Sequence, residues 1–266
     1  MNDVPMIPTL INGQWQVLLP EHRAVRPEWY TETGWERARL GSMHHHLTAL
    51  CERATGPDIG RRPVIIDVGV EEGDLTALYS QWGCDVVMVE PNPKVWPNVR
   101  AIWEANGLRD PLYAFVGFAG DACDYHGPGH AQWFDTHVGP THGWPRCAFG
   151  DVIGDHAFLH LAQHPHVPTQ TLDYMMALAG VNVDAITMDV EGSELTVLRG
   201  AEGILADDRP LVWVSVHTDA QWMDENYPLD GRAAVLEWMA KRDYAGTLLA
   251  IDHEEHWFFQ PIGRMA

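Results

Sequence analysis

The feature that most constrains the fold is an alternation of short apolar runs with helix-like segments, which begins near residue 63. The apolar runs show no polar alternation, which is typical of parallel strands that are buried on both faces. These runs are Val64–Val68, Val86–Val89, Tyr113–Val116, Ala185–Asp189 and Leu211–Val216. The segments between them have helical spacing and cover 73–82, 95–106, 172–179, 193–205 and 233–242. The pattern predicts an α/β fold with a mostly parallel sheet and helices on both of its faces.

The end of the chain adds a different signal. Two extended segments, Thr247–Ile251 and His256–Gln260, are joined by a polar turn. Because a short turn can join only antiparallel strands, we expect this pair to add one antiparallel strand to the sheet.

Residues 1–60 lie outside the alternation and are predicted to form an N-terminal extension to a main domain over 61–266. Within the extension, the turn-prone Asn12-Gly13 pair predicts a short hairpin. The apolar spacing of Trp29–Cys51 predicts a helix.

A second irregular stretch, 122–167, interrupts the main domain between the third and fourth strands and is rich in His, Gly, Pro and aromatic residues. Long irregular insertions in compact domains often form binding loops or lids. We therefore expect this insertion to cover the crevice at the carboxyl ends of the strands, where a ligand would bind. There it would offer Trp133 and Trp144 as stacking partners for a substrate.

Composition excludes several functions. The chain has 17 basic and 37 acidic residues, a net charge of −20, so nucleic acid and anionic membranes are not expected as partners. No apolar run approaches the ~18 residues that cross a bilayer, and the N-terminus lacks a signal-peptide pattern. The four Cys are far apart, without a CxxC pair. These features predict a cytoplasmic protein; its oligomeric state stays open.

The loop after the first strand carries the first chemical motif. It reads Asp67-Val68-Gly69-Val70-Glu71-Glu72-Gly73, a DxGxxxG pattern rather than the GxGxxG of most dinucleotide-binding proteins. Its glycines allow a sharp turn and a close approach of ligand to backbone. Its acidic residues favour a cationic ligand over a pyrophosphate, and S-adenosylmethionine has that character.

Glu90 strengthens this interpretation. It ends the second strand, 23 residues after Asp67. A carboxylate at that place can accept hydrogen bonds from both hydroxyls of a ribose. The two motifs together predict a nucleoside-binding site.

The chain also resembles the FkbM-type methyltransferases. The resemblance rests on VIIDVGVEEGD, VVMVEPNP, EANGL, FVGFAGD, TLDYM, ITMDVEGSELTVLRGAEGIL, PLVWVSVH and GTLLAIDHEEHWFF. It implies a class I methyltransferase fold, Rossmann-like, that uses S-adenosylmethionine, usually for O-methylation of hydroxyls. One departure is that the usual first loop has Ala-Asn where Val70-Glu71 stand in this chain.

The resemblance implies cofactor-binding roles by position. The first loop would shape the methionine pocket, the end of the second strand would hold the ribose, and the segment after the third strand would hold the adenine. These positions are Asp67, Gly69, Gly73, Glu90, Asn92, Ala119, Gly120 and Asp121.

The ends of the fourth and fifth strands supply candidate catalytic residues. Asp189 and His217 end these strands, and ligands in open parallel sheets bind beyond the carboxyl ends of strands. Either side chain could take the proton of an acceptor hydroxyl. A divalent metal held by Asp189, Glu191 and His217 is the alternative, although no metal site is predicted outright. We place Glu191 and Glu194 on the substrate side.

The sequence therefore predicts an S-adenosylmethionine-dependent O-methyltransferase that acts on a glycan or small-molecule hydroxyl. Two alternatives stay open. One is a nicotinamide-dependent oxidoreductase on a similar sheet, which the missing GxGxxG disfavours. The other is a non-catalytic binding protein that keeps the fold.

Overall fold

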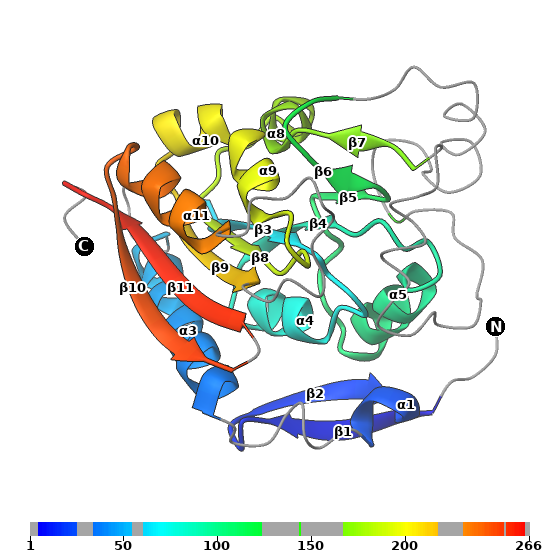
Figure 1. Cartoon of the computed structure of the whole chain (residues 1–266). Coiled ribbons are helices and arrows are strands. Elements are labelled where there is room, and N and C mark those ends of the chain that lie inside the picture. Colours follow the sequence, from blue (N-terminus) through cyan, green and yellow to red (C-terminus); the bar gives the residue numbers. More distant parts are fainter. Residues whose placement is uncertain are drawn as a thin grey trace.

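A seven-stranded sheet forms the centre of the molecule (Figure 1). The computed structural model describes residues 5–25, 34–54, 61–123, 144, 167–217, 231–252 and 254–263. The strand order is β10-β11-β9-β8-β3-β4-β5. The strands are β3 (Val64–Val68), β4 (Asp85–Val89), β5 (Tyr113–Phe115), β8 (Ala185–Met188), β9 (Leu211–His217), β10 (Tyr244–Ile251) and β11 (Glu254–Pro261).

The sheet is mostly parallel, as predicted. Strands β5, β4, β3, β8 and β9 run parallel to one another. Strand β11 pairs antiparallel with both β9 and β10, so it is the single antiparallel strand of this sheet. The chain leaves β3 to one side for β4 and later returns to the other side for β8, which makes the gap between β3 and β8 the topological switch point.

Helices cover both faces of the sheet, which confirms the predicted α/β class (Figure 1). They are α3 (Gly34–Ala54), α4 (Asp74–Gln81), α5 (Trp96–Ala105), α8 (Leu172–Ala179), α9 (Glu194–Arg199), α10 (Glu202–Asp207) and α11 (Gly231–Ala240). Neighbouring strand residues point to opposite faces: Ile65 packs with residues of α3, α4 and α5, and Ile66 packs with residues of α8 to α11. This double burial explains why the strands lack polar alternation.

The prediction of one helix over 193–205 is wrong, because the structure has two short helices that break at Gly200 and Ala201. A Cβ atom on Gly200 would lie 1.8 Å from the carbonyl oxygen of Gly120. The chain therefore makes a close backbone contact at this point, which periodicity alone does not reveal.

The N-terminal residues form a hairpin, β1 (Met6–Ile11) and β2 (Trp15–Pro20), followed by the short helix α1 (Glu21–Ala24). Asn12 and Gly13 both have positive φ and lie at the centre of a tight turn, which the N–H of Gln14 closes by donating to the carbonyl of Ile11 at 3.0 Å. The side chain of Asn106 docks the hairpin on the end of α5, since its amide exchanges two 2.9 Å hydrogen bonds with the backbone of Leu18. Asn106 is thus structural.

Helix α3 belongs to the same core. Leu40, Met43 and Leu47 are fully buried and lie in one cluster with Trp213 and Phe258 of the sheet. The N-terminal residues therefore share the apolar core of the main domain, and the division at residue 60 stays a prediction. Within the described ranges, no helix is long and apolar enough to span a bilayer.

A short parallel pair of strands, β6 (Phe118–Ala119) and β7 (Thr169–Gln170), flanks the insertion at 122–167 in the sequence. Trp133 and all eight histidines of 122–167 lie outside the described residues.

Candidate active site

The site lies at the switch point, where the loops after β3 and β8 meet. The N–H of Gly69 donates to the carbonyl of Val89 at 2.9 Å, and the N–H of Asp189 donates to the carbonyl of Val68 at 3.0 Å. Gly69 has φ +84°, and a Cβ atom there would lie 1.9 Å from the carbonyl oxygen of Asp189. Only glycine fits, so the first loop crosses directly beside the catalytic candidate.

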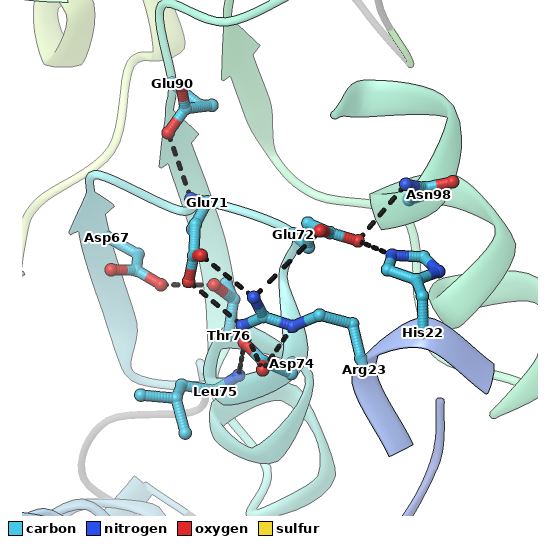
Figure 2. A network of polar contacts seen from close by, with 10 residues as sticks. All are labelled: His22, Arg23, Asp67, Glu71, Glu72, Asp74, Leu75, Thr76, Glu90 and Asn98. Atoms are coloured by element: carbon cyan, nitrogen blue, oxygen red, sulfur yellow. Dashed lines mark hydrogen bonds and ion pairs between the residues drawn. The ribbon is translucent and has the colours of Figure 1, made fainter. Parts of the chain in front are cut away.

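Glu90 follows β4 and faces this loop (Figure 2). Its carboxylate accepts from the N–H of Asn92 at 2.7 Å on Oε1 and from the N–H of Glu71 at 3.0 Å on Oε2. Burial raises the pKa of Glu90 to about 8, and the two backbone hydrogen bonds oppose that rise. A carboxylate offers about four acceptor positions, so each oxygen keeps one for a further donor.

The other residues of the predicted cofactor pocket have mixed positions. Asp67 is buried and accepts a hydrogen bond from the hydroxyl of Thr76, which ties β3 to α4. Burial raises the pKa of Asp67 to about 7. Gly73 has φ +84° at the start of α4, and the side chain of Asn92 accepts from the N–H of Lys94 at 3.1 Å.

The predicted adenine side follows β5. Ala119 lies in β6, and the N–H of Gly120 donates to the carbonyl of Gln170 at 2.9 Å, which fixes this segment against β7. Asp121 comes next and is exposed. The segment lies beyond the same sheet edge as Glu90, whose N–H donates to the carbonyl of Phe115 at the end of β5.

His217, at the end of β9, is surrounded by carboxylates. Its Nδ1 lies 2.8 Å from Oε1 of Glu194, and its Nε2 lies 3.0 Å from Oε2 of Glu254. Nε2 also lies 3.3 Å from Glu191 and 3.8 Å from Asp189. The structure thus brings both catalytic candidates together with Glu191, as the strand order predicts.

These contacts change the roles that the sequence suggested. Burial opposes the charge on His217, but hydrogen bonds with Glu194 and Glu254 outweigh it and raise its pKa to about 11. The raised pKa favours a protonated imidazole at neutral pH, which argues against the predicted role of His217 as a general base. Burial, reinforced by Glu254, raises the pKa of Asp189, while Arg39 and His217 lower it.

Sequence reasoning missed two members of this cluster. The sequence pattern places Glu254 in the terminal polar turn. In the structure Glu254 begins β11, which pairs with β9 so that Glu254 lies opposite His217. Arg39 of α3 lies 3.7 Å from Asp189 and donates to the hydroxyl of Thr187 at 3.2 Å. An acidic residue at the start of the closing strand was a usable signal for Glu254; Arg39 had none.

Two residues expected on the substrate side have partners within the protein. Glu194 is buried and bonds to His217 and to the N–H of Gly192 at 2.9 Å, so it faces the histidine. Trp144 stacks edge-on against Trp103 and donates to Asp110 at 2.9 Å. Asp110 precedes β5, so Trp144 lies on the side of the sheet where the parallel strands begin. The candidate site lies on the other side, at their carboxyl ends. Glu191 is 42% exposed and stays available to an acceptor.

The cluster also contains a possible metal ligand set. Donor atoms of Asp189, His217 and Glu254 all lie within 4.8 Å of one another. Carboxylate oxygen and imidazole nitrogen suit several divalent metals. A cation could therefore take the place of the His217 proton.

The carboxylates of the acidic first loop have cationic or imidazole partners within the protein, which the sequence did not lead us to expect. Arg23 of α1 forms a two-pronged contact with Glu71, at 2.8 and 3.0 Å, and contacts Asp74 at 2.6 Å. His22 lies 2.5 Å from Glu72 (Figure 2). The charges of this loop are paired within the protein, by residues that sequence reasoning did not single out.

The mostly parallel sheet with one antiparallel strand, the glycine-bearing first loop and the acidic end of the second strand have the arrangement of a Rossmann-like class I methyltransferase fold. A family model, the methyltransferase FkbM domain, matches residues 67–245. The chain therefore belongs to the FkbM methyltransferase family. This result sets aside the oxidoreductase alternative.

Solved structures show distant likeness. A methyltransferase FkbM from Methylobacillus flagellatus has 14% identity and a TM-score of 0.46, with 84% of this chain and 53% of that chain covered. A Bacillus subtilis tRNA methyltransferase has 12% identity, a TM-score of 0.42 and coverage of 84% and 65%. A T. thermophilus 16S rRNA methyltransferase in complex with AdoMet and guanosine has 13% identity, a TM-score of 0.45 and coverage of 96% and 50%. The chain thus spans about half the length of the Methylobacillus flagellatus protein. A search of curated proteins gives no match.

Proposed function

We propose that this chain uses S-adenosylmethionine to methylate a hydroxyl group of a glycan or small molecule. The observation that carries the proposal is the Glu90 carboxylate, buried at the end of β4 beside the glycine loop. Each of its oxygens accepts one backbone N–H and keeps an acceptor position, which fits the two donor hydroxyls of a ribose.

Other residues around Glu90 also suit S-adenosylmethionine. Glu90 would hold the ribose, Gly69 would let the methionine portion approach the backbone, and Asp121 would accept from the adenine amino group. Asp67 and Gly73 would support the pocket rather than contact the ligand. When bound, S-adenosylmethionine supplies an electrophilic methyl group.

The residues of the strand-end cluster would prepare the acceptor. We assign the proton-accepting role to Asp189, because its side chain is one-third exposed, whereas the raised pKa of His217 favours a protonated imidazole. Glu191 would orient the acceptor hydroxyl. His217 would hold the carboxylates in place and keep Asp189 ionised, with Glu194 and Glu254 fixing both of its ring nitrogens.

A divalent cation bound by Asp189, His217 and Glu254 is the competing way to activate a hydroxyl, since a metal lowers the pKa of an oxygen bound to it. Dialysis against a chelator separates the two mechanisms. Activity that is lost and then restored by Mg²⁺ or Mn²⁺ would favour the metal; unchanged activity would favour Asp189 alone.

The test of the cofactor is calorimetric titration of the protein with S-adenosylmethionine, S-adenosylhomocysteine and, as a control, NADH. We expect both S-adenosyl compounds to bind and NADH not to bind. Absence of S-adenosylmethionine binding would overturn the proposal. Binding without methyl transfer to any of a panel of hydroxylated acceptors would instead favour a non-catalytic binding protein.

A further inference from the structure

The first loop of the site is held by a segment that lies outside the family match. Helix α1 and its hairpin precede residue 67, where the match begins. Arg23 of α1 is buried, with a side chain only 5% exposed, and its guanidinium points into the loop between β3 and α4 (Figure 2).

The guanidinium contacts three carboxylates, Glu71 and Glu72 of the loop and Asp74 at the start of α4, with Glu72 the most distant at 4.0 Å. Nη1 and Nη2 of Arg23 contact the two oxygens of Glu71, and Nε and Nη2 contact Oδ2 of Asp74 at 3.2 and 2.6 Å. A planar fork of this kind fixes direction as well as charge. Because Asp74 is as buried as Arg23, removing the arginine would leave a buried carboxylate without this partner.

The contact between Arg23 and Glu71 also bears on the Glu90 carboxylate, to which we assign the ribose. Glu71 has φ +52°, a left-handed conformation that costs energy for a residue with a Cβ atom. In this conformation its N–H points at Oε2 of Glu90, at 3.0 Å. Arg23 thus holds the side chain of the residue whose backbone orients Glu90.

We propose that Arg23 is a positioning residue for the cofactor site, which it shapes by clamping Glu71 so that the Glu71 N–H fixes the Glu90 carboxylate. This inference rests on the proposed use of S-adenosylmethionine. It makes the N-terminal residues part of the working site, although the family match does not include them. Glu71 is also one of the two positions at which this loop departs from the sequence that the family resemblance leads us to expect.

The test compares Arg23→Ala, Arg23→Lys and Glu71→Gln with the full-length wild type by calorimetric titration with S-adenosylmethionine. We expect the Kd to rise about tenfold or more for Arg23→Ala, with a smaller rise for the other two variants. Because Asp189 lies on a different strand end, kcat at saturating cofactor should change little while KM for the cofactor rises. Arg62→Ala is the control: Arg62 bonds to the carbonyl of Gly83 at the opposite edge of the sheet.

A double variant separates positioning from plain destabilisation. If Arg23 acts through Glu71, Arg23→Ala combined with Glu71→Gln should bind no more weakly than Arg23→Ala alone. Folded Arg23→Lys and Glu71→Gln proteins with wild-type Kd would overturn the inference, even if Arg23→Ala does not fold. Wild-type protein that fails to bind S-adenosylmethionine would overturn the proposed function itself.

Discussion

At the scale of residues, Glu90 gives the most direct prediction. Replacing it with Gln turns one acceptor oxygen into an amide donor, so a ribose hydroxyl loses its partner and S-adenosylmethionine should bind more weakly by about 1–3 kcal/mol, the cost of an unsatisfied buried hydrogen-bonding group. Calorimetry checks the loss. Glu104→Gln, on the exposed side of α5, is the matched control and should bind normally. Equal affinity in the two variants would place the ribose elsewhere.

Proton transfer at Asp189 gives a second prediction at this scale. Asp189→Asn should lower turnover by about 10²–10⁴ while cofactor affinity is kept, because only the proton acceptor is lost. The exposed Asp207→Asn serves as the control. Cofactor binding and turnover measured on the same protein separate this result from unfolding, and near-normal turnover would remove Asp189 from the mechanism.

His217 should act on the pH dependence of the same step. The base works when ionised, so activity should rise with pH through the raised pKa of Asp189. His217→Gln removes a positive charge that lowers this pKa, so the rising limb should move to higher pH. A limb that does not move would argue that His217 plays no part in ionising Asp189.

Site residues could be predicted from the sequence where a local pattern marks them, and could not where only a contact between distant segments brings them to the site. Glu90, Asp189 and His217 each end a strand, and the carboxyl ends of parallel strands meet at one edge, so local patterns suffice to group them. Glu254 and Arg23 join the site only through an antiparallel register and a docked helix. Those contacts join segments far apart in the chain, which no local pattern encodes.

At the scale of elements, the strands and most helices were predictable because burial on two faces leaves continuous apolar runs. The break between α9 and α10 was not, because a close backbone contact between Gly200 and Gly120 decides it. A helical pattern in the sequence continues across this point, and only the packing of another segment interrupts it.

This contact supports a prediction about stability. Gly200→Ala would place a methyl group against the carbonyl oxygen of Gly120, so the free energy of unfolding should fall by about 2 kcal/mol or more. Gly41→Ala is the matched control: Gly41 lies inside α3, a Cβ atom there meets nothing within 4 Å, and alanine should stabilise the helix by about 0.5–1 kcal/mol. Urea unfolding of both variants checks the opposite signs.

At the scale of the whole molecule, the charge of −20 bears on the acceptor. Binding to RNA gains most of its free energy from basic residues that neutralise phosphates, and this chain has an excess of acidic ones. Labelled single- and double-stranded RNA should therefore bind with a Kd weaker than about 10⁻⁴ M at 50 mM salt, measured by fluorescence anisotropy. Tighter, salt-sensitive binding would redirect the search for the acceptor to RNA.

The site's titrating groups should also make stability depend on pH. Burial raises the pKa of Glu90 to about 8 and those of Asp67 and Glu191 to about 7, all above the values of an unfolded chain. His217, with a pKa near 11, keeps its proton in the folded state long after an unfolded histidine has lost it. Between pH 7 and 9 the folded protein thus binds more protons than the unfolded chain, so stability must fall as pH rises.

His256 has the opposite sign, because burial lowers its pKa to about 4, but its effect ends near pH 6.5, where an unfolded histidine has also lost its proton. The melting temperature of cofactor-free protein should therefore drop by roughly 5 °C from pH 7 to pH 9 at constant ionic strength. Differential scanning calorimetry measures it. Glu90→Gln, which cannot titrate at this position, should show a shallower decline, and a flat or rising melting temperature in wild type would show that the buried carboxyls are not protonated in the folded state.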